Sequence, residues 1–91
     1  MALIIHIDGK VEDREGMTFA EAKEAIGGGY VQDVPIRHEK YCGIICDENG
    51  KAKGMEANHH ATGLVGSYLL PFDFLVGTII LYSKGEIYSG N

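Results

Sequence analysis

YCGIICDENGKAKGMEANHHATGLVG, residues 41–66, combines an apolar run, a turn and a polar cluster, and the rest of the chain can be placed around it. The apolar residues at 41–46 predict a short buried strand, because they form a run of strand length that is bounded by a turn. Asn49-Gly50 follows, and this pair favours a two-residue hairpin turn of type I′, in which both central residues need positive φ. We therefore predict a hairpin whose returning strand covers residues 51–55.

The segment after this hairpin predicts a second helix and the last strong strand. Asn58 is a good N-cap for a short helix that ends at Gly66. Residues 76–82 are rich in β-branched side chains and predict a central strand. A turn at 83–85 then leads into a weak terminal strand at 86–88.

The first fifteen residues predict another hairpin. Residues 3–7 form a β-branched run, and Asp8-Gly9 supplies a second turn of type I′. Residues 10–15 can return as a polar strand. Its charges fit an edge position, because charged edges discourage pairing between molecules.

A helix and a further strand follow this hairpin. The sequence TFAE at 18–21 matches a capping box, and the helix should run to Ile26 with Gly27 as its left-handed stop. Residues 30–36 alternate as a strand, and Pro35 favours an edge position or a strand end. The three glycines between these elements predict a cap and a turn, because a phosphate-binding loop requires the order strand, glycines, helix.

These elements predict one α+β domain over residues 1–91. We expect a mostly antiparallel sheet of five to seven strands with two short helices, because hairpins dominate the pattern and helices are few.

Charge and hydropathy exclude several classes of protein. The 91 residues carry a net charge of −5, and the basic residues are scattered, so we expect no nucleic-acid binding. The start of the chain lacks the basic residues of a signal peptide. The longest apolar stretch, residues 69–81, is broken by Pro71, Asp73 and Gly77, so we expect no membrane span. We expect a cytoplasmic location.

Cys42 and Cys46 lie four residues apart on the predicted strand. Their separation along a strand is about 13 Å, which is too long for a disulfide between them. Small buried thiols in a reducing compartment are the favoured interpretation, and zinc bound with the histidine pair is the alternative. We expect no metal and no cofactor.

Candidate binding residues concentrate around the second helix. His59 and His60 point about 100° apart on a helix, so they do not form a shared metal pair. They are either surface histidines or part of a ligand pocket at the helix start. For that pocket we select the residues Asn58, His60 and Thr62, together with Arg37 and Tyr30.

The sequence shows no catalytic constellation. Its serines have no nucleophile-elbow context, its paired carboxylates lie at turns, and Cys46 lies within a strand pattern. We therefore predict a protein that is not an enzyme, with no catalytic residues. Its aromatic residues are numerous in the second half, which suits self-association or stacking on a flat ligand as well as core packing.

The order of several short motifs resembles a family of short bacteriophage, plasmid and actinobacterial proteins classed as domain of unknown function 3846. The matched features are Asp8-Gly9, Gly29-Tyr30-Val31, Cys46-Asp47-Glu48-Asn49-Gly50-Lys51, Asn58 with Ala61-Thr62, and Val76-Gly77-Thr78-Ile79-Ile80. The resemblance covers most of the chain; His59-His60 and the loop at 68–74 lie outside it. It implies an accessory protein of a mobile element that acts by binding, in the host cytoplasm if it is phage-encoded.

We therefore state three functional hypotheses, of which the third is a small hydrolase or zinc protein that requires bound metal or turnover. The first is a non-enzymatic homo-oligomer that binds a small anionic, nucleotide-like ligand at a site shared between subunits, and so sequesters a host defence signal. The second is an acidic protein-interaction module that inhibits or modulates a host protein.

Overall fold

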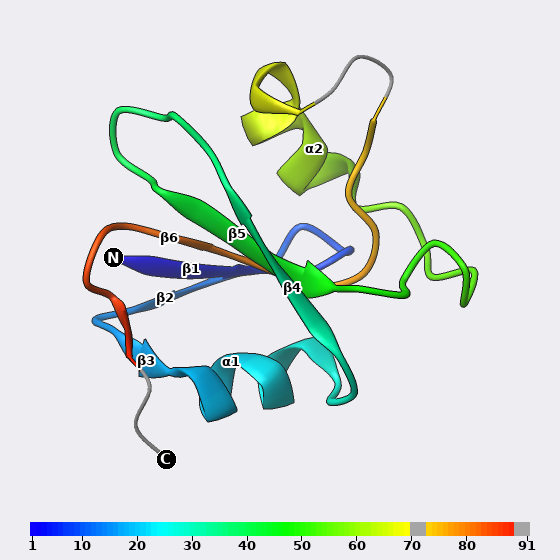
Figure 1. The fold of residues 1–91 in the computed structure, drawn as a ribbon. Helices are drawn as coiled ribbons and strands as arrows, with labels where there is room; N and C mark the ends of the chain where they lie inside the picture. Colours follow the sequence, from blue (N-terminus) through cyan, green and yellow to red (C-terminus); the bar gives the residue numbers. More distant parts are fainter. Residues whose placement is uncertain (70–72, 89–91) are drawn as a thin grey trace.

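The computed structural model describes residues 1–69 and 73–88 and confirms the predicted α+β class. In these ranges an antiparallel sheet of five strands has the order β2-β1-β6-β5-β4, and two short strands form a second sheet. The α-helices lie on opposite faces of the large sheet (Figure 1). The elements are, in chain order, β1 (Ala2–Ile5), β2 (Val11–Arg14), β3 (Met17–Thr18), α1 (Phe19–Ile26), β4 (Val31–Pro35), β5 (Gly43–Asp47), α2 (His59–Val65), the 3-10 helix η1 (Gly66–Tyr68), β6 (Ile79–Tyr82) and β7 (Ile87–Tyr88).

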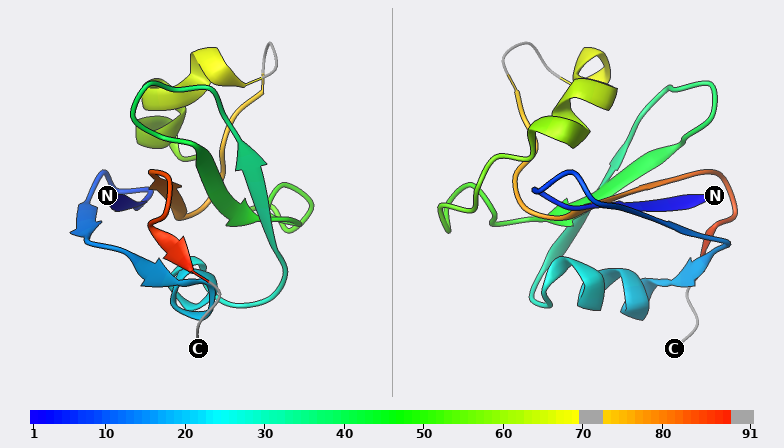
Figure 2. Two further views of the ribbon diagram at one scale, coloured as in Figure 1. Left: turned by 60° about the vertical axis from the view of Figure 1, so that its left-hand side comes forward. Right: turned by 180° about the vertical axis from the view of Figure 1, so that it is seen from behind.

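The large sheet carries an apolar cluster on each face. Ile79 and Leu81 of β6 belong to the cluster beneath α2, whereas Ile80 belongs to the cluster above α1. The neighbouring β5 repeats this division with Ile44 and Ile45. Both faces of these central strands are therefore covered, as the two further views show (Figure 2). This explains why their sequences are continuous apolar runs rather than alternating ones.

The first predicted hairpin is present, but its turn differs from the prediction. β1 lies inside the sheet and β2 forms its edge. The His6 N–H donates to the Lys10 carbonyl at 2.9 Å, and the Gly9 N–H donates to the His6 carbonyl at 3.0 Å. The loop thus ends in Gly9 at φ 94°. A three-residue loop closed by a left-handed glycine replaces the expected two-residue turn of type I′.

The capping box of α1 is confirmed. The Glu21 N–H donates to Thr18 Oγ1 at 3.1 Å, and the Thr18 N–H donates to Glu21 Oε1 at 2.9 Å. A left-handed glycine ends the helix as expected. Ala22 and Ile26 are buried against the sheet, whereas Phe19 remains 41% exposed.

The hairpin predicted at Asn49-Gly50 is wrong. β5 pairs with β4 and β6, and residues 51–54 form turns, so the predicted returning strand over residues 51–55 is absent. The Asn49 N–H donates to Asp47 Oδ1 at 2.8 Å, and the Gly50 N–H donates to the Asp47 carbonyl at 3.2 Å. Gly50 does not have the positive φ that a type I′ turn needs. Asp47 has therefore redirected the chain at the end of β5.

The C-terminal part agrees with the prediction except for one pairing. β6 is central, between β1 and β5, and β4 is the second edge of the sheet, as Pro35 suggested. The weak terminal strand β7 pairs in parallel with β3, a strand that the sequence did not predict. The predicted loop residue Phe72 lies outside the described residues.

Candidate functional site

Asn58, selected for a ligand site, is completely buried and is bonded within the chain. Its Nδ2 donates to the carbonyls of Ile5 and Gly77, both at 2.9 Å, and its Oδ1 accepts the Ala61 N–H at 3.0 Å. Its relative exposure is 0%. The side chain caps α2, as predicted, and also ties α2 to β1 and to the segment before β6.

His60 and Thr62 lie on different sides of α2, because they are two residues apart on a helix. Thr62 Oγ1 accepts the Leu75 N–H at 3.0 Å and so fixes the chain that leads to β6. The exposed His60 ring lies against Gly9, where an added Cβ would come within 2.8 Å of Cε1 and Nε2. Both side chains therefore contact segments beside α2: His60 lies against the turn after β1, and Thr62 bonds the segment before β6.

Tyr30 and Arg37 lie beyond opposite ends of β4, and both are exposed. Seven residues of extended chain separate them by roughly 20 Å. That distance is too long for both side chains to hold one small ligand within one subunit. A single chain therefore does not bring the five selected residues together.

A hollow of about 430 Å³ lies on the α2 side of the sheet. It is bounded by β4, by the end of β5, by η1 and by the segment that precedes β6. Side chains that give it apolar and aromatic walls are Val34, Cys46, Tyr68, Leu69, Phe74 and Leu75. The hollow is large enough to take one large side chain.

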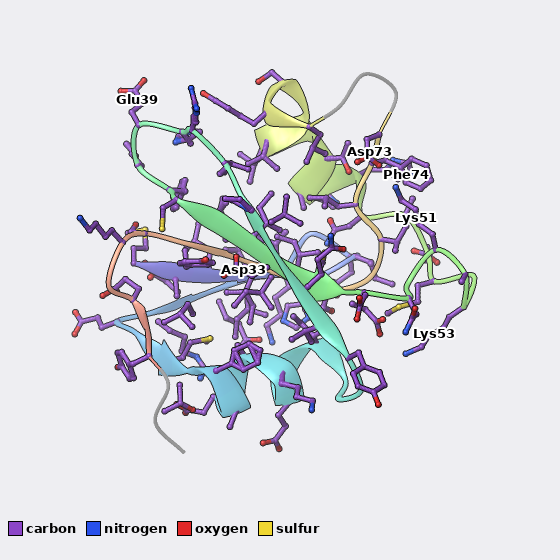
Figure 3. The ribbon with its side chains drawn as sticks, viewed as in Figure 1. Asp33, Glu39, Lys51, Lys53, Asp73 and Phe74 are labelled. Carbon is purple, nitrogen blue, oxygen red and sulfur yellow. The ribbon has the colours of Figure 1, made fainter. Side chains whose placement is uncertain are left out.

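Charged groups surround this hollow. Lys51 Nζ forms an ion pair with Asp73 and lies 4.6 Å from the centroid of the Phe74 ring. Figure 3 labels these three side chains, which lie side by side. The Lys51 hydrogen bond, with help from the Phe74 N–H, lowers the pKa of the Asp73 carboxyl. Asp47 is paired with Lys53, Nζ to Oδ2 at 2.9 Å, and Asp73 is paired with Lys51, so Glu48 is the lining carboxylate without an ion pair among the described residues. This balance favours a cationic or neutral group over an anion.

The thiol in the hollow is not activated. Burial, followed by the neighbouring Asp47, raises the pKa of the free Cys46 thiol, so the thiol remains protonated near neutral pH. The other cysteine, Cys42, is also free. Over residues 1–69 and 73–88, no group of three or more His, Cys, Asp and Glu side chains is arranged to hold a metal ion.

The hydrogen bonds at both ends of β4 establish which way its backbone groups point. The Glu48 N–H donates to the Tyr30 carbonyl at 3.0 Å, and the Ile36 N–H donates to the Cys42 carbonyl at 3.1 Å. In an antiparallel pair, hydrogen-bonding residues alternate along the strand. The even-numbered residues of this strand therefore direct their N–H and C=O groups toward β5.

The odd-numbered residues of β4 direct their backbone groups away from the sheet. In the described part of the chain β4 pairs with β5 alone, so the N–H and C=O groups of Val31 and Asp33 have no strand beside them. Pro35 is the next outward position, so its missing N–H removes no bond from the β4–β5 ladder. The edge lies directly beside the hollow, which Gln32 and Val34 line from β4.

The Asp33 side chain is held on the α1 side of this edge. Tyr82 donates its hydroxyl to Asp33, with oxygen distances of 2.6 and 2.7 Å. The Tyr82 ring crosses β5 over Gly43, where an added Cβ would lie 2.4 Å from the hydroxyl oxygen. Burial and this carboxylate raise the pKa of the Tyr82 hydroxyl. The Asp33 carboxylate is thus held by the Tyr82 hydroxyl on the α1 face and does not cover the outward backbone groups of β4.

A second polar cluster lies where β1 and β2 meet their turn. His6 Nε2 lies 2.6 Å from Glu12 Oε2, and His6 Nδ1 lies 3.5 Å from Thr78 Oγ1. The His6 hydrogen bond, followed by that from Arg14, lowers the pKa of the Glu12 carboxyl. These side chains do not line the hollow; they link β1, β2 and the segment that precedes β6.

The sequence did not predict the hollow. The alternation of residues 30–36 places Gln32 and Val34 on one face, and this was the available signal. Nothing local indicated that Asp73 and Phe74 would meet Lys51, because more than twenty residues separate them along the chain.

Comparisons with protein-family models, with curated proteins and with solved structures found no match to this chain. The family resemblance of the sequence motifs therefore stays a prediction. Among the described residues, no helix is long and apolar enough to cross a membrane.

Proposed function

We propose that this protein is an interaction module that binds an extended segment of a partner protein as an additional strand on β4. The unpaired outward backbone groups of Val31 and Asp33, beside an apolar hollow, carry this proposal. Strand addition uses such groups for affinity, and an adjacent pocket that takes alternate side chains supplies specificity. This is the second of the three hypotheses from the sequence, with a defined surface.

The chemistry of the hollow predicts the bound segment. One apolar or aromatic side chain would pack on Val34 and Leu75, and a lysine or arginine near it would meet the carboxylate of Glu48. The net charge of −5 favours the same kind of partner.

A random-peptide display selection, with matched proline variants, tests this function. Val31→Pro removes an outward N–H of β4 and leaves the bonds to β5 in place, as native Pro35 does. Asp13→Pro is the control, because the His6–Lys10 bond places Asp13 at an outward position of the other edge strand, β2. We expect selected peptides to bind wild type and D13P equally and to bind V31P at least about tenfold more weakly.

N-methylated peptides provide a second readout that does not depend on the variant folding. Two versions of each peptide are made, one methylated at the odd-numbered and one at the even-numbered backbone nitrogens. Only one version should lose binding, because only every second peptide N–H faces β4. Peptides that tolerate every methylation, or that bind V31P as well as wild type, would overturn strand addition.

The nucleotide hypothesis stays a prediction with its own measurement. Native mass spectrometry of freshly purified, undialysed protein would show a multimer with an added nucleotide-sized mass if that hypothesis is correct. A protein without added mass would contradict it. The Glu48 carboxylate, which has no ion pair among the described residues, is the reason that we place protein binding first.

A further inference from the structure

We infer that β4 pairs with β4 of a second copy of this chain, so that two five-stranded sheets join across a two-fold axis. This inference rests on the proposed function, because it names a partner for the same edge. Two-fold pairing requires a surface that is complementary to itself. The outward groups and side chains of β4 meet that requirement.

The backbone selects one register. Centring the axis on Gln32 places Val31 opposite Asp33 of the partner subunit, and both residues turn N–H and C=O groups outward. Centring it on Asp33 would place two carboxylates opposite each other and would pair Val31 with Pro35, which has no N–H to donate. Centring it on Val31 would overlap fewer residues of the strand. The Gln32-centred register therefore uses every outward N–H and C=O group of Val31 and Asp33 without placing two carboxylates opposite each other.

The side chains on the α2 face fit the same register. Tyr30, which is 73% exposed in the single chain, lies opposite Val34 of the partner subunit, and the symmetry repeats this contact. Aromatic and β-branched side chains form favourable cross-strand pairs. The two Gln32 amides meet on the axis, where each can donate to the other. An exposed aromatic side chain thus gains a packing partner.

This pairing changes how the outer residues are placed. Tyr30 of one subunit and Arg37 of the other come to the same end of the paired strands, although they are roughly 20 Å apart in one chain. The two hollows flank the axis on the same face, because Gln32 and Val34 line them. Self-pairing occupies the edge that a partner segment needs, so the dimer and the partner complex exclude each other.

Cross-linking at Gln32 tests the register directly. In the Gln32-centred register the two Gln32 residues form a non-hydrogen-bonded pair, with Cα atoms roughly 4.5 Å apart, which is within disulfide range. The Gln32→Cys variant is made with Cys42→Ala and Cys46→Ala, because Gln32 also lies opposite Cys46 within the chain. Val34→Cys in the same background is the matched control, since it would lie opposite Tyr30 of the partner subunit.

We expect mild oxidation to convert Q32C, but not V34C, into a covalent dimer. We also expect V31P to shift the wild-type dimer to a monomer in sedimentation at equal concentration. A monomeric wild type together with Q32C that does not cross-link would overturn self-pairing. Selected peptides that lose affinity for V31P would still support strand addition in that case. If Q32C cross-links but the selected peptides bind V31P as well as they bind wild type, strand addition by a partner is overturned and self-pairing is supported.

Discussion

At the scale of the single residue, the Asn58 side chain joins three segments of the chain by hydrogen bonds. Its amide bonds the carbonyls of Ile5 and Gly77 and the N–H of Ala61, and all of these groups belong to different segments. A buried polar group that loses its partner costs the free energy of its desolvation. The residue therefore stabilises the junction of α2 with the sheet.

Replacement of Asn58 by alanine should lower the free energy of unfolding by about 3 kcal/mol, because it removes the cap and takes one donor from each of the Ile5 and Gly77 carbonyls. Asn58→Ser, which keeps only the capping oxygen, should recover a part of this loss. Urea denaturation measures both, with His59→Ala as the control at an exposed neighbouring position. A loss for N58A no larger than for H59A would contradict this role.

The sequence predicted one half of what Asn58 does. The cap could be predicted because its partner, Ala61, is three residues away. The two carbonyl contacts could not be predicted, because Ile5 and Gly77 come from distant parts of the chain and approach only after the sheet has formed. The five selected residues show the same limit, since their types fit a ligand site but local patterns do not determine their distances in space.

At the scale of elements, Tyr82 connects three strands on the α1 face. The side chain starts on β6, passes over Gly43 of β5 and donates to Asp33 of β4. Glycine in a strand interior often marks a place where another group approaches closely. Gly43 is such a place, because a Cβ there would overlap the Tyr82 ring.

Gly43→Ala should therefore destabilise the protein by about 2 kcal/mol, since the Tyr82 side chain must leave its position. In a Tyr82→Ala background the same change should cost much less, because the ring that would clash is absent. Chemical denaturation of the wild type, both single variants and the double variant gives the coupling between the two positions. Additive losses would show that the ring contact does not explain Gly43.

The wrong hairpin at Asn49-Gly50 shows why turns were less predictable than strands. The Asn-Gly pair fits a type I′ turn locally, but Asp47 accepts the Asn49 N–H and starts a different turn. A Cβ on Gly50 would lie 2.7 Å from Val76, so tertiary packing also restricts this position. Strand pairing is similarly non-local. The buried strands β1, β5 and β6 were predicted from their apolar runs, and β7 was predicted as a weak strand, whereas the two-residue β3 was too short to be recognised.

At the scale of the whole molecule, two apolar clusters share one sheet. Ile79 belongs to the cluster beneath α2, and Ile80 belongs to the cluster above α1. The two residues are neighbours on the central strand β6. Met17 of β3 and Ile87 of β7 complete the cluster above α1, but the central strands contribute to both clusters. The shared strand should therefore couple the two clusters, so that neither can unfold alone.

Ile79→Ala and Ile80→Ala form a matched pair that tests this coupling. Both residues have a relative exposure of 0%, so each change should cost about 3 kcal/mol through lost contacts and the cavity left behind. We expect each variant to unfold in a single transition, with native-state hydrogen exchange in α1 and α2 accelerated together. If I80A loosened α1 alone and I79A loosened α2 alone, the sheet would not couple its two faces. Joint acceleration would instead mean that the central strand holds the fold together as one cooperative unit.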